Sequence, residues 1–125
     1  MDIIATALIH KALEGLYQRH LYTSQNIANA NSPGYAPVRV TFEESLRAAA
    51  ANGVAAIEDV EPQIQSIAHT ALSGAPGDTT EAGAEGLRLD LELAEASQTA
   101  MRYRALLDVL SRQMALERAV VSQGR

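Results

Sequence analysis

The residues of this chain that could do chemistry do not combine into a recognisable catalytic or metal site. Its three histidines, His10, His20 and His69, are 10 and 49 positions apart, so no two share a helix face at the four-residue spacing of a metal-binding pair. A position in a contact between helices explains His20 better than a role as a ligand. We therefore expect no metal and no cofactor.

Carboxylates and hydroxyls give catalysis no better support. Neighbouring acids such as Glu43 and Glu44 need an apolar pocket to shift their pKa values before they can act as acid and base, and solvated surface positions explain them better. Ser24 and Ser111 fall on predicted helices with no base nearby in the sequence. An enzyme is the least favoured class.

The strongest local pattern is the ten-residue segment that starts at Asn26. Pro33 ends the preceding helix because its ring disfavours a helical Ser32, and Pro33 followed by Gly34 suits a type II turn. A helix stop is the simplest interpretation, yet the pattern is longer than a stop requires. Its defining residues are Asn26, Ile27, Ala28, Asn29, Ser32, Pro33, Gly34 and Tyr35.

The sequence predicts two long helices, and the motif that starts at Asn26 lies at the end of the first. Residues 2–30 contain no proline and one glycine, and apolar or small side chains recur there with a seven-residue period. A clearer repeat of the same kind begins near Asp90, a suitable N-cap, and continues for about four heptads. The residues expected on a helix-packing seam are Leu13, Leu16, Ile27, Leu93, Ala100, Tyr103, Leu107, Leu110 and Met114.

The predicted fold is mainly α, with the two terminal helices paired as a coiled-coil-like hairpin around an irregular, partly extended and flexible centre. One structural unit is expected, divided into residues 1–35, an acidic centre at 36–88, and 89–125. Within the centre, residues 37–42 favour an extended segment, residues 47–56 a weak helix, and residues 73–86 a flexible loop. A hairpin that buries all its apolar residues internally is the alternative to one that offers apolar flanks to other chains.

Composition excludes several further classes. The 125 residues contain no cysteine, so disulfides and thiolate sites are absent, and the net charge of −5 lacks the basic field that nucleic acid or an anionic membrane surface requires. Met1 and Asp2 do not resemble the basic start of a cleaved secretory signal, and no 18-residue apolar run is present. We expect no nucleic-acid binding and no direct lipid insertion.

The pattern that starts at Asn26 resembles the Asn-Ile-Ala-Asn-x-x-(Ser/Thr)-Pro-Gly-Tyr motif of bacterial flagellar axial proteins. The stretch Leu-Asp-Leu-Glu-Leu-Ala from Leu89, and the later Arg-Tyr-Arg-Ala-Leu from Arg102, are similar to the family's C-terminal helix. Phe42, Glu43 and the overall length resemble its proximal rod subunits most. The resemblance covers residues 1–46 and 87–125.

This resemblance implies a structural, non-catalytic subunit of the basal-body rod, which crosses the periplasmic space and transmits torque for motility. It implies export by the flagellar type III apparatus without a cleaved signal peptide. It also implies assembly through the terminal helices into a hollow tube. The implied partners are copies of the chain itself, other flagellar rod proteins, and components of the membrane ring and export gate.

Two alternatives remain at this stage. A sibling rod subunit, or an inner-rod component of a secretion system, belongs to the same class at another axial position. A soluble helical export adaptor or chaperone belongs to a different class, and it would fold stably alone and remain in the cytoplasm.

Overall fold

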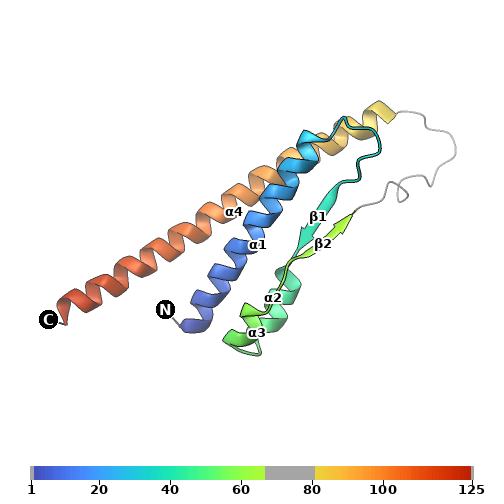
Figure 1. Ribbon diagram of the computed structural model, residues 1–125. Helices are drawn as coiled ribbons and strands as arrows, with labels where there is room; N and C mark the ends of the chain where they lie inside the picture. Colours follow the sequence, from blue (N-terminus) through green and yellow to red (C-terminus); the bar gives the residue numbers. More distant parts are fainter. Residues whose placement is uncertain (1, 67–80, 125) are drawn as a thin grey trace.

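The chain folds around two long helices, one near each end, and the segment between them in sequence forms two short strands and two short helices that lie beside the N-terminal helix (Figure 1). The computed structural model describes residues 2–66 and 81–124, with side chains from residue 89 onward in the second range. The prediction of a mainly helical fold with a long helix near each end is confirmed. The elements are α1 (Ile3–Ala28), β1 (Val38–Thr41), α2 (Glu43–Ala50), α3 (Val54–Glu58), β2 (Gln63–Ser66) and α4 (Glu81–Gln123).

The last helix begins earlier than the sequence predicts. A start near Asp90 was expected, whereas α4 already begins at Glu81. Of the loop predicted at residues 73–86, residues 73–80 lie outside the described part of the chain, and residues 81–86 belong to α4. The extra turns contain Gly83 and Gly86, which oppose helix, beside Ala and Glu residues, which favour it, and a helix that has already formed adds residues at little cost in free energy.

The centre contains more regular structure than predicted. The extended stretch expected at residues 37–42 includes β1, which pairs antiparallel with β2 so that Val38 lies opposite Ser66. The weak helix expected at residues 47–56 corresponds to parts of α2 and α3. Gly53 separates these two helices with a φ of 94°, a conformation that other residues rarely adopt.

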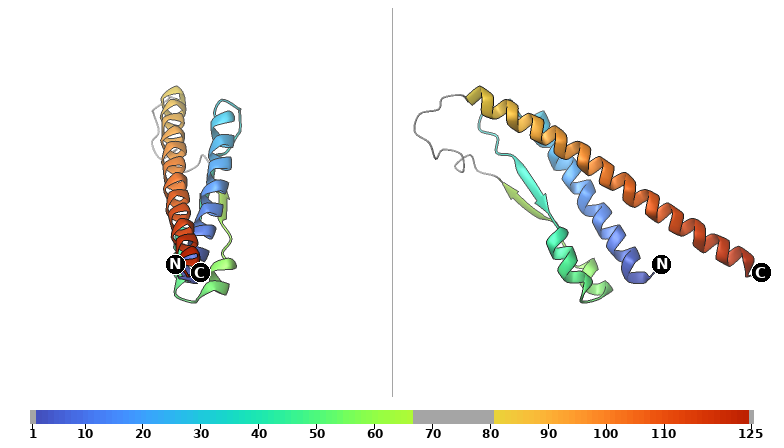
Figure 2. Two further views of the ribbon diagram at one scale, coloured as in Figure 1. Left: turned by 90° about the vertical axis from the view of Figure 1, so that its left-hand side faces the viewer. Right: turned by 180° about the vertical axis from the view of Figure 1, so that it is seen from behind.

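α1 is the central element of the fold. It lies between α4 on one side and the strands and short helices on the other, as Figure 1 and the right-hand view of Figure 2 show. The buried apolar core joins α1 to the segment from Phe42 to Val60, and α4 adds the partly buried Tyr103 and Leu106 at its edge. The core residues are Leu16, Phe42, Leu46, Ala49, Ile57 and Val60.

Gly15 allows the Phe42 ring to approach the α1 backbone. A Cβ atom at position 15 would lie 2.6 Å from two atoms of that ring and 2.7 Å from a third. Alanine at this site would gain about 1 kcal/mol of helix propensity. The overlap with a buried aromatic ring costs about 1–3 kcal/mol, so we expect Gly15→Ala to lower the free energy of unfolding measured by urea denaturation.

The control for this prediction is the same substitution beside a smaller core residue. In a Phe42→Leu background the new methyl group has room, and Gly15→Ala should be neutral or stabilising there. If Gly15→Ala changes stability equally in both backgrounds, contact with the Phe42 ring is not the reason for the glycine.

Candidate functional site

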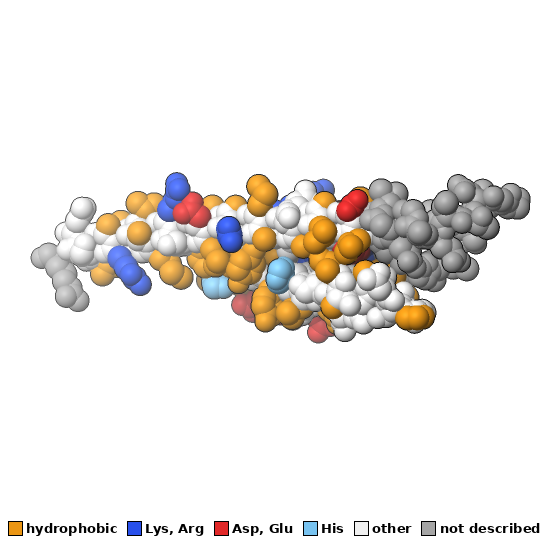
Figure 3. Space-filling model, turned by 90° about the horizontal axis from the view of Figure 1, so that it is seen from above, with side chains coloured by type: hydrophobic (Ala, Val, Ile, Leu, Met, Phe, Trp, Pro, Cys, Tyr) orange, Lys and Arg blue, Asp and Glu red, His pale blue; other side chains and the backbone are white. Residues whose placement is uncertain are grey.

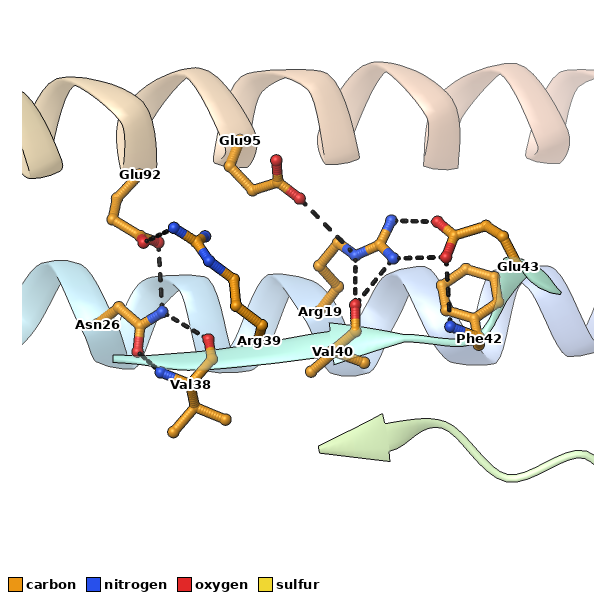
Figure 4. Close-up of polar contacts among 9 residues, drawn as sticks. All are labelled: Arg19, Asn26, Val38, Arg39, Val40, Phe42, Glu43, Glu92 and Glu95. Carbon is orange, nitrogen blue, oxygen red and sulfur yellow. Dashed lines mark hydrogen bonds and ion pairs between the residues drawn. The ribbon is translucent and has the colours of Figure 1, made fainter. Parts of the chain in front are cut away.

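Asn26 joins three parts of the chain through one buried amide group (Figure 4). It is 3% exposed. Its Oδ1 accepts hydrogen bonds from the Val38 N–H at 2.9 Å and the Tyr35 hydroxyl at 2.8 Å. Its Nδ2 donates to the Val38 carbonyl at 2.8 Å and to Glu92 Oε2 at 3.2 Å. All of the amide's hydrogen-bonding capacity is therefore used to connect α1, β1 and α4.

The rest of the motif shapes the path from α1 to β1. Gly34 has a φ of 73°, and the Tyr35 N–H donates to the Ser32 carbonyl at 3.3 Å, as the predicted type II turn requires. Asn29 Nδ2 donates to the Gln25 carbonyl at 2.9 Å and so caps the helix end. Ile27 is half-buried and Ala28 is exposed. The turn brings Tyr35 back to Asn26, a role that a helix stop alone would not need.

The Tyr35 phenol completes this cluster. Its burial, together with the negative charge of Glu92, raises the pKa of Tyr35. A phenol with the ordinary pKa of 10.0 is already protonated at neutral pH, so the raised pKa extends the hydrogen bond from Tyr35 to Asn26 to more alkaline solution.

Arg19 is a second connection, which the sequence interpretation missed. It is 8% exposed, and its Nε and Nη2 donate to the Val40 carbonyl at 3.1 and 2.9 Å. Nη2 also donates to Glu43 Oε2 at 2.8 Å. The guanidinium lies 4.9 Å from the centroid of the Phe42 ring, within range of a cation–π interaction. The sequence did contain a signal for the burial of Arg19. Its spacing from Leu16 and Asn26 places all three residues on one face of the helix.

Glu43 is held in its charged form by these contacts. Partial burial acts to raise its pKa, but hydrogen bonds from Arg19 and from the backbone N–H groups of Glu43 and Phe42 outweigh burial and lower the pKa to about 2. Glu43 is therefore a structural carboxylate, not an acid or base poised for proton transfer at neutral pH.

Two carboxylates of α4 form ion pairs with arginines of α1 and β1. Glu92 is 2% exposed, and its Oε1 lies 2.7 Å from Arg39 Nη2, an ion pair that lacks the alignment of a hydrogen bond. Glu95 Oε1 lies 3.8 Å from Arg19 Nε. These contacts and the bond from Asn26 make the inner face of α4 polar where it meets α1 and β1 (Figure 4).

The face of α4 turned toward α1 has the predicted period but a different phase. The most buried side chains there are Glu92 and Thr99, each one residue before a predicted seam position. The predicted Leu93, Leu107 and Met114 are 50%, 42% and 45% exposed in the single chain. Tyr103, Ala100 and Leu110 are half-buried, so they lie at the border of the two faces.

α1 shows this shift in part. Arg19 and Asn26 are buried one residue before His20 and Ile27, whereas Leu16 and Thr23 are buried where the repeat expects them. His20 is exposed at the border of the groove between α1 and α4. Leu16 is buried in the core, and Leu13 is half-buried. Asn26 and Arg19 are polar, yet they are buried on the inward face of α1, where their hydrogen bonds to β1 replace those to water.

The outer surface of α4 is the candidate interaction surface. Its C-terminal part extends away from the rest of the chain (Figures 1 and 2), and hydrophobic side chains are spread along it (Figure 3). A soluble monomer rarely exposes so many large apolar side chains on one helix. Those exposed beyond Arg104 are Leu107, Val109, Met114, Leu116, Val120 and Val121.

A groove runs between α1 and α4 where the two helices begin to separate. It encloses about 380 Å³ and is lined by Leu16 and Tyr17 from α1 and by Thr99, Ala100 and Tyr103 from α4. His20 and Arg104 also border it. Its lining is mostly apolar and offers no arrangement of acid, base and nucleophile.

Within the described ranges, no helix is long and apolar enough to cross a membrane, and no group of three or more His, Asp or Glu residues could hold a metal ion. No protein-family model matches the chain, and no curated protein matches it.

Replacing Asn26 should weaken the fold more than replacing any other amide of the motif. Asn26→Ala leaves buried backbone groups of Val38 without partners, which costs about 2–3 kcal/mol of unfolding free energy. Urea denaturation followed by circular dichroism measures this loss. The matched control is Asn29→Ala, which removes a more exposed cap and should cost less than about 1 kcal/mol. Equal losses for the two variants would contradict the assigned role of Asn26.

The Glu43 carboxylate predicts a specific acid sensitivity. A pKa of about 2 in the folded chain, against 4.5 for the ordinary group, means that Glu43 contributes its full stability above about pH 4.5. That contribution falls as the pH decreases and is lost near pH 2. Unfolding free energies measured from pH 7 to 2 should therefore fall less steeply for Glu43→Gln than for the wild type. Glu44→Gln removes the neighbouring charge and is the control, and identical slopes for Glu43→Gln and wild type would contradict the prediction.

Proposed function

We propose that this chain is a structural subunit of the bacterial flagellar basal-body rod, in the proximal position occupied by proteins of the FlgB type. It assembles through its terminal helices, paired as a coiled-coil-like hairpin, into the hollow shaft that crosses the periplasmic space. Its partners are copies of itself, other rod proteins, and components of the membrane ring and export gate. It reaches this site by export without a cleaved signal peptide, and it performs no catalysis.

The observation that carries this proposal is the exposed apolar surface of α4. Thirteen large hydrophobic side chains of the described residues are exposed, and nine of them belong to α4. Long helices gain most of their stability from packing of an apolar face, and the C-terminal half of α4 has little such packing within the chain. A subunit that is buried among neighbours explains this surface, whereas a soluble adaptor that folds alone does not.

The motif at Asn26 gives a second line of support. Its resemblance to axial proteins extends over residues that are remote from the assembly surface, and each conspicuous one has a structural task. Asn26 and Tyr35 bind one another, and Gly34 supplies the turn that brings them together. The motif thus builds the platform on which α4 lies, as expected for a shared subunit architecture.

Mass spectrometry of purified hook–basal bodies tests the proposal directly, beside a deletion strain scored for swimming. We expect the chain to remain with the detergent-extracted rod, and its deletion to abolish motility. Crosslinked neighbours then distinguish the proximal position from a sibling position. A chain that is absent from the particle and soluble in the cytoplasm would identify an export adaptor instead.

Leu107→Asp should abolish incorporation into the rod without unfolding the free chain. Leu107 is 42% exposed, so the charge disturbs a surface between subunits more than the fold. The measurement is complementation of the deletion strain in soft agar, with circular dichroism of the purified variant. Gln98→Asp, an exposed substitution on the opposite side of α4, should swim normally. Normal swimming of Leu107→Asp would remove the support for this surface.

A further inference from the structure

The outer edge of β2 is open, in contrast to the outer edge of β1. All four residues of β2 are exposed, and β2 packs closely against β1 on one side (Figure 1). Side chains of α1 bind the polar groups of β1 that face away from β2. Within the described part of the chain, no residue does the same for β2. The two-stranded sheet therefore has one closed edge and one open edge.

The register of the two strands identifies the open groups. In an antiparallel pair, successive residues point their N–H and C=O groups alternately toward the partner strand and away from it. Val38 and Val40 point away from β2, because side chains of α1 bind their polar groups. Ser66 lies opposite Val38, and Ile64 lies opposite Val40. The N–H and C=O groups of Ile64 and Ser66 therefore point away from β1, and we call these four groups the β2 edge.

The composition of β2 leaves this edge without the usual protection. Proteins commonly guard an edge strand with a lysine, a proline or a bulge, because its free main-chain groups are a template for another strand. Gln63–Ser66 contains no charged residue and no proline, and its pairing with β1 is continuous. An extended segment can therefore add to β2 as a third strand, held by main-chain hydrogen bonds to the β2 edge.

An acidic groove adjoins β2 at Ile64. It encloses about 410 Å³ and lies between α1 and the segment that joins α3 to β2. Lys11 in its lining is already paired with Glu14, at 3.2 Å. Three further acids of the lining are exposed and form no ion pair with another described residue: Glu58, Asp59 and Glu61. The groove thus has an excess of negative charge beside the open strand.

We propose that the β2 edge binds an extended segment of another protein, in which basic residues alternate with β-branched residues. The main chain of that segment pairs with Ile64 and Ser66. Every second side chain of the segment then lies on the face of the sheet that carries Ile64, beside the acidic groove. Basic side chains at these positions complement the charge of the groove.

The same charge argues against a second copy as the occupant. Pairing β2 with β2 of another copy would bring two acidic grooves to one sheet, where like charges oppose the contact. The site lies on the opposite side of α1 from α4 (Figure 1). It therefore uses none of the exposed apolar surface of α4 and does not depend on the proposed rod function.

A fluorescein-labelled octapeptide that alternates lysine with valine tests the proposal on the full chain. We expect saturable binding in fluorescence anisotropy, at least tenfold tighter than that of the same peptide with glutamate in place of lysine. Hydrogen exchange followed by nuclear magnetic resonance then locates the contact. The lysine peptide should slow exchange of the Ile64 and Ser66 amides at least fivefold more than that of the Gln63 and Gln65 amides, which already face β1.

Ile64→Pro and Ile64→Thr are a matched pair of variants. Both remove the isoleucine side chain, but only Ile64→Pro removes the outward N–H, and neither loses a hydrogen bond to β1. We expect Ile64→Pro to weaken binding of the lysine peptide at least tenfold and Ile64→Thr less than threefold, with unchanged circular dichroism for both.

Four results would overturn the proposal. Absence of binding to the wild type, equal binding by the two variants, or equal slowing of exchange at all four amides of β2 would exclude strand addition. Equal binding of the lysine and glutamate peptides would exclude a basic partner. Analytical ultracentrifugation without peptide covers the remaining occupant, because a wild-type dimer that Ile64→Pro abolishes would identify a second copy in place of another protein.

Discussion

The outer edge of β1 is the constraint on which the rest of the structure depends. Backbone N–H and C=O groups that face away from β2 must find partners within the protein once α1 and α4 cover them. Asn26 binds both polar groups of Val38, and Arg19 binds the Val40 carbonyl. Side chains of α1 thus replace a third strand, which fixes the rotation of α1 about its axis and places Leu16 against the Phe42 core.

The same constraint determines how α4 lies on the platform. Arg19, Arg39 and Asn26 present donors to α4, and Glu92 and Glu95 supply the matching carboxylates. A buried carboxylate is tolerated only beside such donors, so the buried Glu92 fixes the rotation of α4 as well. Apolar side chains of α4 such as Leu107 are then exposed. A polar inner contact is therefore the physical reason that an apolar surface of α4 faces outward.

The sequence predicted the two long helices, the seven-residue period and the turn at Pro33, because all three depend on local spacing. It placed Leu16 correctly in the core, but it missed the buried polar residues that lie one position before several expected seam residues, since a hydrophobic repeat assigns polar side chains to solvent. Arg19, Asn26 and Glu92 are buried by partners up to 66 positions away, which no local pattern contains. The early start of α4 was missed because Asp90 resembled a cap and because Gly83 and Gly86 disfavour helix before it.

The apolar core lies mainly between α1 and the segment from Phe42 to Val60, so α4 buries few of its own apolar side chains in the single chain. Every fully buried apolar residue of the core lies between Leu16 and Val60, whereas α4 contributes only partly buried side chains. Ionic contacts at its N-terminal half define orientation more than they add stability, because ion pairs gain little once desolvation is counted. A helix of 43 residues held in this way is well placed but incompletely packed. In the proposed assembly its remaining apolar surface is buried by neighbouring subunits, so the contacts that orient α4 within one chain also decide which of its faces is offered to the next.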